Sequence, residues 1–219
     1  GETTMKRREL LKLTGAALGL TLFPMAGMAW VQQKKAKVLF FTRSQGFIHP
    51  VIDRKGSELG FAEQVLVDLG KKHGVEVVCS KDGGLFDGDL DQYDAIAFYT
   101  SGDLTQPGGD NQPPMSAAGK KKLLEAIAAG KGFVGFHAAA DSFRTPGGEK
   151  DPYIAMLGGE FIAHGTQQDV PNLVVSPKFP GCEYLGQSFH FKEEWYTFDK
   201  FADDLHVILV QDTTKMSLT

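Results

Sequence analysis

The stretch Gly132-Phe133-Val134-Gly135-Phe136-His137-Ala138-Ala139-Ala140-Asp141-Ser142-Phe143 is an apolar run that ends in one polar residue set among small ones. Its first six residues have the length and character of a strand that is buried on both faces. A nucleophile elbow has the same pattern, because small neighbours are needed where a strained turn brings its apex close to other backbone. The stretch therefore predicts a strand and a sharp turn with His137 at the apex.

Strands and helices alternate in the chain before this stretch. Residues 58–72 carry Phe61, Val65, Leu66 and Leu69 on one side at helical spacing. The expected elements, in order, are strand 36–42, helix 58–72, strand 75–79, strand 95–100 and helix 116–129. A strand, a helix and a strand in that order favour the parallel crossover unit. The pattern predicts an α/β fold, a doubly wound parallel sheet with flanking helices in three flavodoxin-like layers.

After Asp151 the regular alternation of strands and helices ends. A short helix is expected at 153–157 and strands at 173–175 and 207–210, with long loops between them. We expect this part to pack on the sheet and not to form a separate domain.

The apex residue also bears on activity. In class I glutamine amidotransferases the centre of the corresponding turn is a cysteine that attacks an amide carbon, whereas here it is His137. Since neither Cys nor Ser is present at that position to form an acyl-enzyme, we do not expect glutamine amidotransferase activity.

Five blocks together resemble the ThuA-like (trehalose utilization) family: residues 37–42, 93–103, 132–143, 153–164 and 190–196. The resemblance implies a class I glutamine amidotransferase-like fold. It also implies a link to the use of trehalose and other sugars, including routes through 3-keto-glycosides, but it defines no reaction. The expected domain covers residues 37–219. Members of the family normally continue with a Gly-Lys-Gly-containing strand and a final helix, so we expect this domain to be shortened at its C-terminus.

The first thirty residues are typical of a targeting signal. Lys6-Arg7-Arg8 is followed by an apolar stretch and by the small residues of Gly27-Met28-Ala29. The Arg7-Arg8 pair resembles a twin-arginine export motif. We therefore expect a signal peptide at 1–30, a linker at 31–36, a periplasmic or extracellular location, and no membrane association once the signal is removed. An uncleaved membrane anchor is the alternative.

Composition and charge narrow the class of partner. The formal net charge is −4, and basic residues are scattered after the N-terminus, which disfavours nucleic acid. A small-molecule carbohydrate is the expected partner, and the sequence leaves the oligomeric state open. Cys79 and Cys182 fit either one disulfide or two buried thiols.

Ligands of open parallel sheets bind at the carboxyl ends of the strands, so polar residues there are candidates. A family block further along the chain adds aromatic side chains that offer stacking faces to a sugar. The candidate substrate-binding residues are Thr42, Arg43, His49, Ser101, Gly102, Asp103, Trp195 and Tyr196.

Two chemistries fit the titratable residues. Three imidazoles, His49, His137 and His164, form a ligand set suited to a divalent metal such as Zn²⁺, although their spacing is not a metal motif. Without a metal, His137 or His164 takes a proton next to a sugar ketone, with Glu193 or Asp141 as partner. Asp141 is equally suited to capping the segment after the turn.

The leading hypothesis is an exported protein that acts on or binds sugars or 3-keto-glycosides, as a metal-assisted or metal-free hydrolase or isomerase. The alternative is a non-catalytic sugar-binding or interaction domain in which His137 occupies a decayed amidotransferase-like site.

Overall fold

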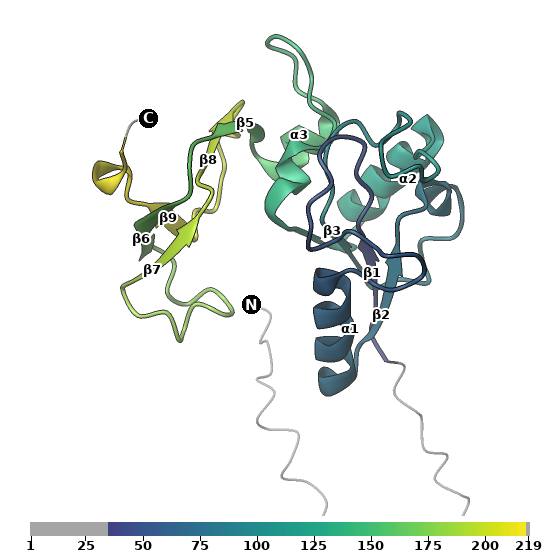
Figure 1. Cartoon of the computed structure of the whole chain (residues 1–219), viewed down its shortest axis with the longest axis horizontal. Helices are drawn as coiled ribbons and strands as arrows, with labels where there is room; N and C mark the ends of the chain where they lie inside the picture. Colours follow the sequence, from purple (N-terminus) through teal and green to yellow (C-terminus); the bar gives the residue numbers. More distant parts are fainter. Residues whose placement is uncertain (1–34, 218–219) are drawn as a thin grey trace, which may run out of the picture. The chain divides into compact units, whose positions relative to one another are not determined.

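The computed structural model of the chain describes residues 35–217, in which four parallel strands form the central sheet (Figure 1). The strand order is β2-β1-β3-β4. The strands are β1 Lys37–Phe41, β2 Glu76–Ser80, β3 Ala95–Phe98 and β4 Gly132–Gly135. This is the flavodoxin-like order. β2 is added on one side of β1, and β3 and β4 are added on the other, so the point between β1 and β3 is the topological switch point of the sheet. The predicted fold class, a doubly wound parallel sheet, is confirmed.

Two long helices flank the sheet, α1 (Phe61–His73) and α2 (Ala117–Ala128). α1 ends where Gly74 adopts φ 72°, a left-handed conformation that glycine reaches without strain. α2 begins at Ser116, whose hydroxyl accepts a hydrogen bond from the backbone N–H of Gly119 at 2.8 Å. Both predicted helices are confirmed, with shifts of one to three residues at their ends.

The hydrophobic core lies on the α2 side of the sheet. Leu39, Phe41, Ile96 and Phe98 point to that side and are fully buried, as is Leu123 of α2. On α1, by contrast, Phe61, Val65 and Leu69 are 71%, 42% and 47% exposed. The helix packs on the sheet with its other side, where Glu63 and Gly70 are buried. The apolar stripe expected from the spacing therefore does not mark the buried face of α1.

The rest of the domain contains the short helix α3 (Pro152–Leu157) and two small antiparallel sheets. β5 (Glu160–His164) pairs with β8 (Tyr196–Asp199). β6 (Gln168–Val174) lies between β7 (Ser188–Glu193) and β9 (Leu209–Gln211). The strand expected at 173–175 is longer and begins earlier, and β5, β7 and β8 were not predicted as strands. Three short 3₁₀ turns complete the described elements: η1 Gly83–Asp87, η2 His137–Asp141 and η3 Thr213–Lys215.

Several expectations concern other parts of the chain. The signal peptide expected at 1–30 and most of the linker lie outside the described residues. Within residues 35–217, no helix is both long and apolar enough to span a bilayer. Cys79 and Cys182 are both free thiols, so the disulfide alternative is wrong.

A buried carboxylate ties α1 to the end of β1. Glu63 is fully buried and accepts hydrogen bonds from the Arg54 guanidinium at 2.8 Å, from the Gly60 N–H at 2.9 Å and from the Thr42 hydroxyl. Burial raises the pKa of Glu63, but these donors together outweigh it and hold the pKa below its usual value. Glu63 is therefore ionised in the folded protein and ties Arg54 and Thr42 together.

This network predicts acid sensitivity. Because the pKa of Glu63 is lower in the folded than in the unfolded chain, its stabilising contribution is present above about pH 4.3, the usual Glu value, and is lost as pH falls through the folded-state pKa. Glu63→Gln is expected to lower the free energy of unfolding at pH 7 by about 1.5–3 kcal/mol. The free energy of unfolding of this variant is also expected to fall less than that of the wild-type protein as the pH is lowered. Urea unfolding between pH 3 and 7 measures both effects.

Glu125→Gln on the exposed side of α2 is the matched control, because an exposed ion pair contributes little. Equal stability losses in the two variants would contradict the role of Glu63.

Candidate functional site

β4 runs directly into the turn that carries His137. The φ angle of His137 is 47°, in the left-handed region that L residues seldom adopt. Ala138 and Ala139 are each 2% exposed, and a Cβ built at Gly135 would lie 3.1 Å from the Cβ of Ala139. The strained apex and the need for small neighbours, both predicted from the sequence, are confirmed.

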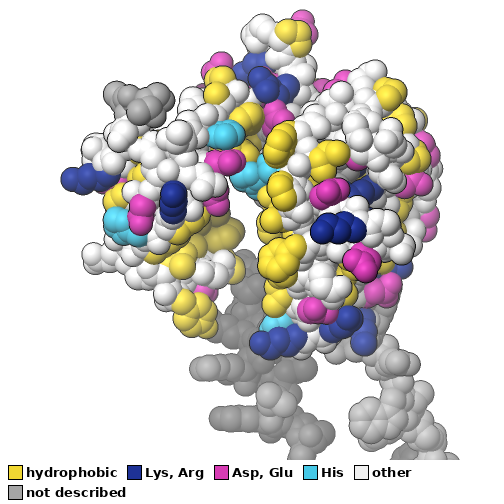
Figure 2. All heavy atoms as spheres, in the orientation of Figure 1, with side chains coloured by type: hydrophobic (Ala, Val, Ile, Leu, Met, Phe, Trp, Pro, Cys, Tyr) yellow, Lys and Arg dark blue, Asp and Glu magenta, His cyan; other side chains and the backbone are white. Residues whose placement is uncertain are grey.

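His137 opens into a cavity of 730 Å³ at the carboxyl end of the sheet, which we call the histidine cavity. Its titratable lining residues are His49, His137, Asp141, His164, Glu193 and Glu194. Figure 2 shows histidine and acidic side chains gathered close together in the hollow of the surface. Phe47, Tyr99, Phe161 and Tyr196 add aromatic walls. The fold therefore brings the three predicted histidines to one cavity.

Strand register places two of these side chains together. In the antiparallel pair of β5 and β8, His164 is the direct partner of Tyr196, and directly opposed residues project from the same face. The two rings are stacked, with centroids 5.7 Å apart and planes at 21°. The small antiparallel sheet thus carries Tyr196 and His164 to the turn after β4.

Hydrogen bonds define the roles of the side chains. The Tyr196 hydroxyl lies 2.8 Å from Nε2 of His137. Burial, followed by the nearby Glu194, raises the pKa of Tyr196, so its hydroxyl keeps its proton. His164 Nδ1 lies 2.9 Å from the carbonyl of Gly165, a contact that requires Nδ1–H as the donor. In neutral His164, Nε2 is then the basic nitrogen.

Glu194 lies between two of the imidazoles. Its Oε2 is 3.7 Å from Nε2 of His137 and 3.7 Å from Nε2 of His164. Burial lowers the pKa of His137, and the charges of Glu193 and Glu194 offset this in part. The resulting His137 is neutral near pH 7, with a carboxylate placed to stabilise positive charge if a proton arrives.

His49 packs edge-on against His137, with ring centroids 4.8 Å apart and planes at 83°. Burial, followed by the nearby His137, lowers the pKa of His49 to about 4. Its Nδ1 is buried with no hydrogen-bond partner within the described structure. His49 is therefore a neutral side chain in the wall of the cavity.

The predicted metal set is not supported by the geometry. Across residues 35–217, no group of three or more His, Cys, Asp or Glu side chains is arranged to hold a metal ion. His49, His137 and His164 share the cavity, but the imidazole pair His49 and His137 meets edge to face and His137 is bonded to Tyr196. As arranged here, these residues do not fit a Zn²⁺ ligand set.

Three predicted substrate-binding residues have structural roles instead. Thr42, Arg43 and Ser101 are fully buried. Arg43 donates to the carbonyls of Leu104 and Gln106 at 2.9 and 2.7 Å, and Ser101 donates to the carbonyl of Phe47 at 2.6 Å. These side chains have no exposed surface to offer a ligand, and their partners inside the protein show that they hold the loops around the cavity.

The remaining predicted site residues lie in different places. Gly102 and Asp103 line a different cavity, and Trp195 donates to the carbonyl of Gln168 at 2.7 Å without lining the histidine cavity. Asp141 ends the η2 turn and accepts from Arg144 at 3.0 Å, so its expected capping role is wrong.

Glu194, Tyr99 and Phe161 line the histidine cavity and were missed as site residues. The signal for Glu194 was its place beside Glu193, two residues before Tyr196.

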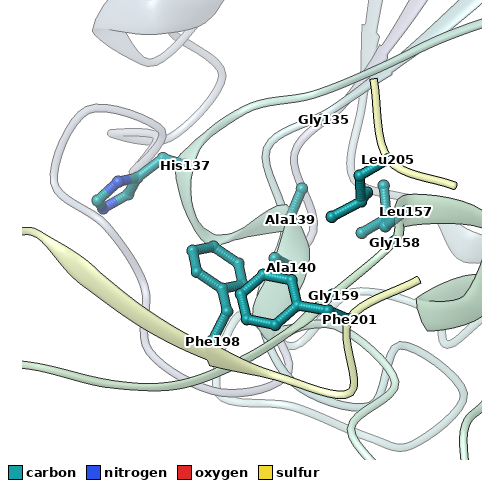
Figure 3. Close-up of a pocket in the computed structure, with 10 residues that line it drawn as sticks. All are labelled: Gly135, His137, Ala139, Ala140, Leu157, Gly158, Gly159, Phe198, Phe201 and Leu205. Carbon is teal, nitrogen blue, oxygen red and sulfur yellow. The ribbon is translucent and has the colours of Figure 1, made fainter. Parts of the chain in front are cut away.

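A smaller apolar hollow of 320 Å³ lies beside the turn that carries His137. Its apolar lining residues include Leu157, Phe198, Phe201 and Leu205. Figure 3 shows the His137 ring directed away from these side chains. The turn therefore separates this hollow from the histidine cavity.

Comparisons with known proteins identify the family of this chain. The family model ThuA, described as trehalose utilisation, matches residues 37–218. The chain belongs to the ThuA family. No curated protein is similar enough in sequence to match.

Two solved ThuA-like structures show the same fold. A ThuA-like protein from Bacteroides uniformis has a TM-score of 0.64 at 21% identity, over 88% of this chain and 75% of that one. A ThuA-like protein from Parabacteroides merdae has a TM-score of 0.51 at 18% identity, over 76% of this chain and 63% of that one. PurLQS from Thermotoga maritima has a TM-score of 0.41 at 15% identity, over 81% of this chain and 75% of that one.

The left-handed backbone at the turn predicts which substitutions the fold of this ThuA protein tolerates. We expect His137→Asn and His137→Gly to unfold at nearly the wild-type urea concentration, since both residues adopt φ 47° readily. His137→Val is expected to be less stable by about 1–3 kcal/mol, because a β-branched residue is strained there. Equal stability of the Val and Asn variants would contradict the strained turn.

Proposed function

We propose that this protein is an enzyme that moves a proton next to the ketone of an oxidised sugar, such as a 3-keto-glycoside. The observation that carries the proposal is the convergence of Tyr196, His137, His164 and Glu194 in one cavity, with the Tyr196 hydroxyl 2.8 Å from His137. Membership of the ThuA family, described as trehalose utilisation, supports a sugar as the substrate.

His164 is the proposed base. Its Nδ1 proton is directed to the Gly165 carbonyl, which leaves Nε2 free to accept a proton, and Glu194 at 3.7 Å stabilises the imidazolium that forms. Tyr196 is the proposed acid. Its raised pKa keeps the phenol protonated, so it donates a hydrogen bond to the ketone oxygen, while His137 orients the hydroxyl by donating its Nε2–H to the phenol oxygen.

The reaction begins when the carbon beside the ketone loses its proton to His164. The C–H electrons form the carbon–carbon double bond of an enolate, and the ketone oxygen gains the negative charge that Tyr196 stabilises. If the deprotonated carbon carries a hydroxyl group, the hydroxyl proton passes to the former ketone oxygen, and His164 returns its proton to the former ketone carbon. A new ketone then forms at the neighbouring carbon, and the sugar is isomerised. In a 3-keto-glycoside, collapse of the enolate instead breaks the bond to the glycosidic oxygen, which takes up a proton and leaves as an alcohol; water then adds to the resulting double bond.

The walls of the cavity suit a sugar. Phe47 and Phe161 offer apolar faces for the C–H side of a ring, and the side chain of Phe47 is 67% exposed and accessible. His49, neutral because of its burial, adds a polar wall without charge. A neutral polyol is therefore a better match than an anionic ligand to this cavity, whose lining also contains Asp141, Glu193 and Glu194.

Two adjacent carboxylates provide a matched test. Glu194→Gln removes the charge beside both imidazoles and is expected to lower kcat on a 3-keto-glycoside by a factor of about 10²–10⁴. Glu193 lines the same cavity and its charge also acts on His137, but it forms no ion pair with either imidazole, so Glu193→Gln is expected to lower kcat by less than Glu194→Gln does. Tyr196→Phe, which keeps the ring, is expected to lower kcat like Glu194→Gln. Stopped assays that follow loss of the keto-glycoside measure these rates.

Binding measured by calorimetry on the same variants separates an enzyme from a sugar-binding domain. Tight binding of the keto-glycoside by wild-type protein, with no turnover under any condition, would overturn the enzymatic proposal and favour the non-catalytic alternative. Turnover by the wild-type protein is also measured with added Zn²⁺ and after treatment with a chelator.

Export is a separate proposal that rests on the Arg7-Arg8 pair and on the apolar stretch after it. Replacing both arginines by lysine is expected to keep the protein in the cytoplasm, whereas the wild-type chain reaches the periplasm or the medium. Cell fractionation followed by immunoblotting measures the distribution. An unchanged distribution in the double-lysine variant would exclude the twin-arginine route.

A further inference from the structure

A second cavity adjoins the histidine cavity. It has a volume of 490 Å³, and we call it the Arg144 cavity after one of its lining residues. The lining residues that bear on its chemistry are Gly46, Gly102, Asp103, Asp141, Arg144 and Glu160. None of the three histidines lines it, so it has no part in the proton transfer proposed above.

The two cavities meet at Asp141, which lines both. Arg144 donates to Asp141 at 3.0 Å and also lies 5.7 Å from the ring centroid of Phe161, a wall of the histidine cavity. Asp141 is therefore the residue at which the two cavities border one another.

The charges of the Arg144 cavity are largely compensated. Asp141 is paired with Arg144, and Glu160 is paired with Lys200 at 2.9 Å. Asp103 has no cation partner within the described structure, and its Oδ1 accepts from the N–H and hydroxyl of Thr105 at 3.0 and 2.7 Å. An anionic ligand would meet an uncompensated carboxylate here. In the described range there is also no cluster of side chains arranged for a metal ion.

Hydroxyl groups match this lining, because each one donates to a carboxylate and accepts from a guanidinium. Arg144 has five N–H donors, of which one is bonded to Asp141, and its side chain is 47% exposed. Asp103 Oδ2 has no hydrogen-bond donor within the described residues. The Arg144 cavity therefore offers both donors and acceptors to a neutral ligand that is rich in hydroxyls.

We propose that the Arg144 cavity binds a second sugar ring, the one joined to the reacting ring through the glycosidic oxygen, so that the preferred substrate has two rings. The proposal rests on the proposed function of the histidine cavity and adds to it the recognition of the leaving group. Asp103 and Arg144 are then specificity residues.

Gly46 provides a way to block this cavity alone. The backbone of Gly46 is not in the left-handed region, and a Cβ built there would have its nearest neighbour 3.6 Å away, an ordinary contact. Gly46→Leu therefore fits the fold and places its side chain at the Arg144 cavity. Gly148→Leu is the matched control, because Gly148 also lies outside the left-handed region, has open space around it and lines neither cavity.

The test compares kcat/KM for 3-keto-trehalose, which has two rings, with that for methyl 3-keto-glucoside, which has one. Wild-type protein is expected to prefer the two-ring substrate by at least tenfold. Gly46→Leu is expected to abolish that preference while changing kcat/KM for the one-ring substrate less than twofold, and Gly148→Leu is expected to change neither value. Arg144→Gln, which adds no bulk, is expected to raise KM for the two-ring substrate alone.

The outcomes distinguish the two proposals. Equal kcat/KM for both substrates in wild-type protein, or equal losses on both in Gly46→Leu and in Arg144→Gln, would overturn the second-ring site and leave the proposed function standing. Neither turnover nor calorimetric binding of either substrate by wild-type protein would overturn the proposed function and this inference with it.

Discussion

The candidate site depends on the left-handed backbone at His137. β4 is the last strand in the order β2-β1-β3-β4, and its pairing with β3 sets where the chain leaves the sheet. At φ 47° the chain turns sharply within one residue and directs the imidazole into the histidine cavity. The buried alanines after the apex leave room for this conformation, and the sheet and core hold it in place.

A second constraint is the register of β5 and β8. A shift of one residue in this antiparallel pair would move either Tyr196 or His164 to the opposite face. Because the two residues are direct partners, the hydroxyl that bonds to His137 and the imidazole proposed as the base enter the cavity together. Two elements far apart in the sequence, a parallel strand with its turn and an antiparallel pair, are therefore both needed to build one site.

The first half of the chain was well predicted from the sequence, because its apolar runs and helical spacing reflect burial in a sheet with two covered faces. Even there, the spacing of Phe61, Val65 and Leu69 indicated a helix correctly but did not indicate which side of it is buried. The second half was poorly predicted. β5, β7 and β8 lie in small sheets with little burial, so their side chains show weak alternation, and long-range pairing decides that they are strands at all.

For the site, the residue pattern was sufficient to place His137 on a strained turn after a strand, because small residues must surround such an apex. It also indicated that an acyl-enzyme cannot form there, since neither Cys nor Ser is present at that position. Which polar residues meet at that turn, by contrast, depends on how distant segments pack together. Arg43 and Ser101 follow strands as His137 does, yet they are buried against backbone carbonyls, while Glu194 and Tyr196 reach the cavity from a distant strand pair. The ends of strands can be predicted from the local residue pattern. The direction in which a side chain points, and the residue that it contacts, depend on packing between segments that are distant in sequence.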